Sequence, residues 1–176
     1  MRQIIVVPHD PAWASAFDAA RDELHRAVGP ALLEVHHIGS TAIPGIHAKP
    51  VIDMLAMVVD LAELDAQTLE VKRLGYEAKG EFGIGGRRYF RRDNAAGVRT
   101  HQVHAFAQGS SHLQRHLAFR DYMRAHPAAA EQYSQLKQKL AAAHPHDMEA
   151  YMHGKHGLIG EYQEKALLWV GCSPAT

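Results

Sequence analysis

Twelve residues separate a Gly-Ser pair from an aspartate that is set into an apolar run. The pair is Gly39-Ser40 and the aspartate is Asp53, inside the segment 51–55. Such a turn lets backbone N–H groups and a hydroxyl approach a phosphate closely, because glycine has no Cβ in the way. A buried carboxylate among apolar residues needs a cation or strong donors beside it. The pattern makes Asp53 the first candidate functional residue and the Gly-Ser turn a candidate phosphate-binding site, and the simplest alternative for the turn is an ordinary tight turn.

Several cations could bind the phosphate electrostatically. Lys49 lies between the pair and Asp53. Arg87 and Arg88 are neighbours on a predicted strand, so one should face the site and the other water, and we assign Arg88 to the site. Tyr151 and Lys155 are one helical turn apart and face the same way. They either close the pocket or only pack there.

Histidines offer a second type of metal ligand. The chain has 14 of them, but no His-Glu-x-x-His motif. His37, beside the Gly-Ser pair, and His104, expected opposite Asp53, rank above the others. Asp53, His104 and His37 are therefore the predicted metal ligands. For His37 and for His104, a hydrogen-bonded structural role is an equal alternative.

These residues are expected on a mixture of helices and strands. Hydrophobic periodicity and turn residues predict helices over 11–28, 61–74, 110–125, 127–143 and 147–170, and strands over 32–38, 51–59, 76–79, 87–90 and 98–106. Strands mixed with helices precede an all-helical C-terminal third. We therefore predict an α+β fold around one sheet.

Composition limits the classes of function. With 176 residues, 47% of them hydrophobic, the chain is predicted to form a single domain over 1–176. Nineteen Lys and Arg balance nineteen Asp and Glu, so the net charge indicates no nucleic-acid or membrane partner. One cysteine and a short apolar N-terminus predict a cytoplasmic protein without a signal peptide or membrane span. The oligomeric state stays open.

Longer strings of residues resemble a known family. The segments are HIGSTAIPG at 37–45 and KPVID at 49–53, and further agreement lies at 7–13, at 87–90 with 100–104, and at Tyr151 with Lys155. They are similar to the GrpB family, whose members have a nucleotidyltransferase-like fold and no firmly assigned activity. The resemblance covers nearly the whole chain. It implies a nucleotidyltransferase-like mixed sheet flanked by helices.

The chain departs from an active nucleotidyltransferase at the metal ligands. Such an enzyme presents two carboxylates at alternate strand positions to hold two Mg²⁺ ions, and the second position here is Leu55. The strand matched to the third carboxylate carries Gln102 and His104. The resemblance implies a ligand that is a nucleotide or another phosphate-bearing small molecule. It also implies that Asp53 is the catalytic residue, holding Mg²⁺ or another divalent metal if nucleotidyl transfer occurs. The alternatives are a non-catalytic binding module and a single-metal hydrolase.

Overall fold

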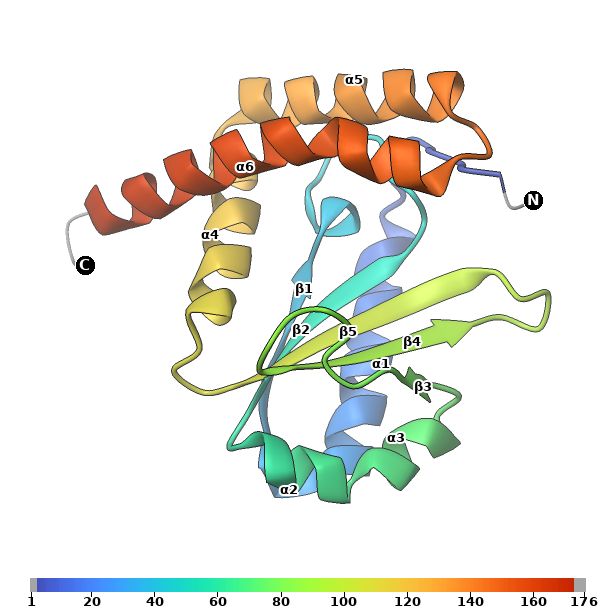
Figure 1. Ribbon diagram of the computed structural model, residues 1–176, viewed down its shortest axis with the longest axis vertical. Helices are drawn as coiled ribbons and strands as arrows, with labels where there is room; N and C mark the ends of the chain where they lie inside the picture. Colours follow the sequence, from blue (N-terminus) through green and yellow to red (C-terminus); the bar gives the residue numbers. More distant parts are fainter. Residues whose placement is uncertain (1–2, 173–176) are drawn as a thin grey trace.

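Five strands form one mixed sheet in the structure, a computed structural model that describes residues 3–172 (Figure 1). They are β1 (Leu32–Ile38), β2 (Ile52–Val58), β3 (Glu77–Ala78), β4 (Arg87–Asp93) and β5 (Arg99–Ala107), in the order β1-β2-β5-β4-β3. Strands β2 and β5 run parallel, whereas the other neighbours are antiparallel. The predicted α+β class with one mixed sheet is confirmed.

Helices cover both faces of this sheet. The first group is α1 (Ala12–Val28), α2 (Leu61–Ala66) and α3 (Thr68–Arg73), and the C-terminal group is α4 (Ser111–Ala125), α5 (Pro127–Ala143) and α6 (Met148–Cys172). In Figure 1, α1 lies behind the sheet, and α5 and α6 lie side by side across its upper end. Helices α5 and α6 therefore form a roof over one end of the sheet.

Local sequence explains most element boundaries. The Asp10 carboxylate accepts the Ala12 N–H at 2.9 Å and starts α1, and Gly29, at φ +65°, ends it. The prediction of one helix over 61–74 is wrong. The chain turns at Gln67, whose N–H bonds to the carbonyl of Leu64, three residues back, at 2.9 Å. Two short helices result, α2 and α3, and each buries one apolar side chain, Leu64 and Val71 respectively.

Alternation along the strands divides the sheet into two unlike faces. One face packs against α1, α2 and α3 in the main hydrophobic core, to which β2 contributes Ile52, Met54, Ala56 and Val58. On the other face, Leu55 joins a smaller cluster with Ile38, Phe106 and Leu113 of α4. This smaller cluster ends before Asp53. The first residues of β2 and β5 are therefore left uncovered by this cluster, and a cavity separates them from α5 and α6.

No helix within residues 3–172 combines the length and the apolar character that a membrane-spanning segment needs.

Candidate ligand-binding site

A cavity of about 500 Å³ lies where the sheet meets α5 and α6, a size typical of small-molecule sites. Its walls come from the β1–β2 connection, the first residues of β2 and β5, the loop before β4, and both roof helices. The lining residues are Gly39, Ser40, Lys49, Val51, Asp53, Phe82, Tyr89, Arg99, Gln102, Tyr133, Lys137, Met148, Tyr151, Met152 and Lys155.

Most of the predicted site residues meet in this cavity. The six that line it are Gly39, Ser40, Lys49, Asp53, Tyr151 and Lys155. His104 stands just behind the wall, with its Nε2 atom 4.0 Å from Oδ1 of Asp53. The Asp53 side chain is 27% exposed, so it opens into the cavity rather than being sealed in the sheet. The structure brings these residues together, while their roles as ligands stay predictions.

Arg88 lies outside the cavity. Its Nε and Nη2 atoms donate to the two carboxylate oxygens of Asp65 on α2, at 2.6 and 2.7 Å. The assignment of Arg88 to the site is wrong because Tyr89, its neighbour on β4, takes the face toward the cavity. Arg87 shares the face of Tyr89, but its guanidinium is directed at the loop before β4.

His37 also lies outside the cavity, on the far face of the sheet from Asp53. It pairs with Met54 across β1 and β2, and its ring stacks on Phe17 of α1 at 4.9 Å. Its Nε2 atom is 2.9 Å from the Thr41 hydroxyl, and burial lowers the pKa of His37 to about 4. His37 is therefore a neutral structural histidine, and the prediction that it shares a metal with Asp53 is wrong.

Gly39 packs directly against the Asp53 carboxylate. Its φ is +71°, and a Cβ atom built on it would lie 2.5 Å from Oδ2 of Asp53. No side chain fits in that space. The glycine predicted to let a phosphate approach instead makes room for the carboxylate beside it.

The roof helices hold the β1–β2 connection in place. The N–H of His47 donates to the Ser134 hydroxyl at 2.9 Å, and the Lys137 ammonium donates to the carbonyl of His47. The hydroxyl of Ser40 donates to that of Tyr133 at 3.4 Å. The loop that carries the Gly-Ser pair is thus positioned by α5.

Two lysines of the roof are buried beside tyrosines. Lys137 is 1% exposed and Lys155 is 9% exposed. Each ammonium lies over the ring of the tyrosine four residues earlier, 4.5 Å from the centroid of Tyr133 and 4.3 Å from that of Tyr151. Burial lowers the pKa of Lys137 to about 7 and that of Lys155 to about 8. The attraction of Asp53 opposes the second shift.

Sequence reasoning found the second Tyr-Lys pair and missed the first. Tyr133 and Lys137 repeat the spacing of Tyr151 and Lys155, and that repetition is a signal that could have identified them.

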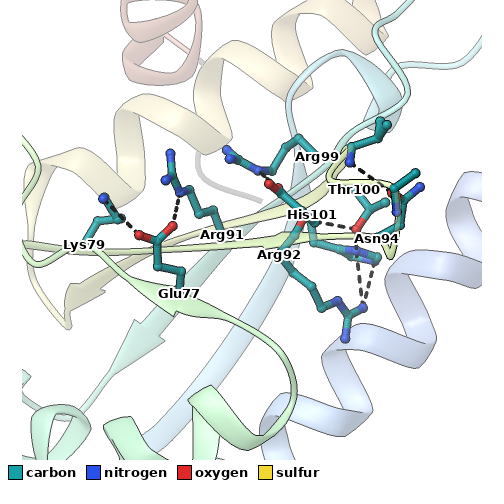
Figure 2. A network of polar contacts seen from close by, with 11 residues as sticks. Glu77, Lys79, Arg91, Arg92, Asn94, Arg99, Thr100 and His101 are labelled. Atoms are coloured by element: carbon teal, nitrogen blue, oxygen red, sulfur yellow. Dashed lines mark hydrogen bonds and ion pairs between the residues drawn. The ribbon is translucent and has the colours of Figure 1, made fainter. Parts of the chain in front are cut away.

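Cations outnumber carboxylates around the cavity. Lys49, Arg99, Lys137 and Lys155 line it, and Asp53 is the one carboxylate among the described lining residues. Figure 2 shows Arg99 at the end of the β4–β5 hairpin, where it forms an ion pair with Asp93. The cavity is therefore suited to an anion.

The donor atoms fit a pair of Mg²⁺ ions poorly. Leu55 is fully buried in its apolar cluster, and Gln102 pairs with Asp53 across β2 and β5. Within the part of the chain that the structure describes, no three His, Cys, Asp or Glu side chains are grouped to hold a metal ion. Asp53 and His104 alone remain of the predicted ligands, and two Mg²⁺ ions need more oxygen atoms than these supply.

Comparison with known proteins places this chain in a family. The chain matches the family described as GrpB protein over residues 3–165. It is 42% identical over 168 residues to UPF0157 protein YqkA of Bacillus subtilis, and the match covers 96% of this chain and 48% of YqkA. The chain thus spans about half the length of that relative.

Solved structures agree with this result. The crystal structure of conserved protein GrpB from Enterococcus faecalis is similar with a TM-score of 0.90 at 40% identity, covering 94% of this chain and 99% of that one. The Cid1 poly(U) polymerase with bound MgGTP matches at a TM-score of 0.52 and 14% identity, over 78% of this chain and 44% of that one. At that identity the likeness shows the fold alone. The chain belongs to the GrpB family and has a nucleotidyltransferase-like fold.

Proposed function

We propose that the cavity binds a phosphate-bearing small molecule. The observation that carries the proposal is the burial of two lysine ammonium groups, Lys137 and Lys155, against a cavity with one lining carboxylate. A desolvated cation is unfavourable unless an anion compensates it. A bound phosphate would supply that anion, and Ser40 and Lys49 line the same cavity.

Binding without two-metal chemistry is the function that the residues support best. Leu55 and Gln102 occupy positions where two further carboxylates would be needed, so we derive no transfer step. The fold is shared with a polymerase whose structure holds MgGTP, which supports a nucleotide as the ligand class. The proposed location is the cytoplasm, in keeping with a sequence that has a single cysteine.

Lys49→Ala should weaken the affinity for inorganic tripolyphosphate by about 1.5–3 kcal/mol, the scale of a charge-assisted hydrogen bond. Isothermal titration calorimetry on both proteins measures the difference. Arg88→Ala is the matched control, because its guanidinium is bonded to Asp65 outside the cavity and its loss should leave the affinity unchanged. Equal affinity of wild type and Lys49→Ala would remove Lys49 from the site. Failure of tripolyphosphate and nucleotides to bind at millimolar concentration would contradict the proposal itself.

Pyrophosphate release from nucleoside triphosphates with Mg²⁺ should be slow or absent in the wild-type protein. Gln102→Glu should tighten Mg²⁺ binding about tenfold, because it adds a second carboxylate that lines the cavity beside Asp53. Leu55→Asp is the poorer variant, since it would place a charge inside the apolar cluster with Phe106. Rapid release of pyrophosphate that Asp53→Asn abolishes would show that the protein is an enzyme.

A further inference from the structure

Three large apolar side chains are exposed around the cavity. Phe82 is 57% exposed, Met152 53% and Met148 37%, and all three line the cavity. Large apolar side chains that are exposed together mark a binding surface more often than scattered ones do. These three side chains line the same cavity as the cations Lys137 and Lys155. A ligand that fills the space therefore meets both an apolar and a cationic surface.

The loop before β4 holds Phe82 in its exposed position. Phe82 has φ +46°, a left-handed conformation that is strained for an aromatic residue. The buried guanidinium of Arg87 donates from Nη2 to the carbonyl of Phe82 at 2.7 Å and from Nε to that of Glu81 at 3.1 Å. These two bonds stabilise the strained backbone and keep the ring exposed at the cavity.

The Phe82 ring has one aromatic and one cationic neighbour. It stacks on Tyr89, with ring centroids 5.3 Å apart and planes at 19°, and the Lys79 ammonium lies 5.7 Å from its centroid. Figure 2 shows that Lys79 and Arg91 both point toward Glu77 on the edge strand β3. Glu77 forms an ion pair with each of them.

Helix α6 supplies the other two apolar residues, Met148 and Met152. Met148, Tyr151, Met152 and Lys155 follow the spacing i, i+3, i+4, i+7, so that one helix face lines the cavity. Sequence reasoning missed both methionines, although this spacing links them to the predicted pair Tyr151 and Lys155.

We infer that Phe82, Met148 and Met152 form a subsite for a planar ring carried by the ligand. The inference rests on the proposed phosphate site and specifies its ligand as a phosphate ester with an aromatic base. Thioethers and aromatic side chains make favourable contacts with such rings, whereas sugars and bare phosphates gain little from them. Phe82 is therefore the residue that distinguishes a nucleotide from other phosphate esters.

The test compares phosphate esters with and without an aromatic base. Calorimetry measures the affinity of the protein for AMP, for UMP and for ribose 5-phosphate. At least one nucleotide should bind about fivefold or more tightly than ribose 5-phosphate, the lower end of what stacking contributes. Phe82→Ala should remove that preference, and Phe82→Tyr should keep it.

Two control variants separate the subsite from general loss of apolar surface. Leu69→Ala removes a side chain that is 68% exposed on α3, and it should leave the preference intact. Met152→Ala should reduce the preference, whereas Leu168→Ala, 69% exposed on the same helix, should not. Tripolyphosphate binding without any preference for the nucleotides overturns the ring subsite and leaves the phosphate proposal in place. Absence of binding by tripolyphosphate, nucleotides and ribose 5-phosphate overturns both.

Discussion

Lys137→Met is expected to stabilise the fold and to abolish phosphate binding. Burial holds the pKa of Lys137 near 7, so at neutral pH the folded protein carries a desolvated ammonium for much of the time. Methionine has a similar length and no charge, and the ammonium's hydrogen bond to the carbonyl of His47 is the main loss. The net gain should be about 1–3 kcal/mol in the free energy of unfolding. Urea unfolding at pH 7 measures it.

Lys139→Met is the matched control for this variant. Lys139 is exposed on the same helix, so its loss should change stability by less than about 0.5 kcal/mol and leave phosphate binding intact. A stabilised Lys137→Met protein that has lost tripolyphosphate binding would show that Lys137 is retained for the ligand at the expense of stability. Destabilisation with unchanged binding would show a structural lysine instead.

The same pKa shifts predict how stability depends on pH. The unfolded chain keeps its lysine protons up to about pH 10.5, whereas the folded protein releases them near 7 for Lys137 and near 8 for Lys155. Between these values the unfolded state binds more protons, so stability rises as pH increases from 6.5 to 9.5. The rise should be about 3 kcal/mol for Lys137 and about 2 kcal/mol for Lys155. Denaturation at both pH values should show a smaller rise in Lys137→Met, with the part due to Lys155 remaining.

Gly39→Ala is expected to destabilise the fold by about 2–5 kcal/mol. Alanine is unfavourable at φ +71°, and its Cβ would lie 2.5 Å from Oδ2 and 3.0 Å from Cβ of Asp53. Either the β1–β2 connection or the carboxylate must move, so ligand binding should weaken as well. Thermal and urea unfolding measure the loss.

Gly45→Ala separates the backbone contribution from the clash. Gly45 lies in the same connection at φ +80°, and a Cβ there meets nothing within 4 Å, so its replacement should cost only about 1–2 kcal/mol. In an Asp53→Ala background the cost of Gly39→Ala should fall toward that of Gly45→Ala, because the oxygen that clashes is gone. Equal costs for the two glycine variants in the wild-type background would contradict the packing of Gly39 on Asp53.

Local patterns predicted much of the fold and part of the site. The strand 32–38 and its Gly-Ser loop follow from short-range alternation and turn residues, and Ser40, Lys49 and Asp53 meet because one loop connects them. Arg88 and His37 could not be placed this way. A shift of one position along a strand moves a side chain to the opposite face, and both faces of this sheet are covered by helices.

Long-range packing determined the remainder. Lys137 reaches the cavity because α5 folds back over the β1–β2 connection, where its ammonium bonds to His47, ninety positions earlier in the chain. The exposure of Phe82 depends on Arg87 holding a strained loop, which no short-range pattern predicts. Both residues are recognised only when the sheet and the roof helices are seen together.

A crystal structure with bound ATP tests the central claim most directly. We predict phosphate density inside the cavity, within hydrogen-bond distance of the ammonium groups of Lys137 and Lys155, with the adenine ring against Phe82. Phosphate density on the outer surface, or an empty cavity at saturating ATP, would contradict it.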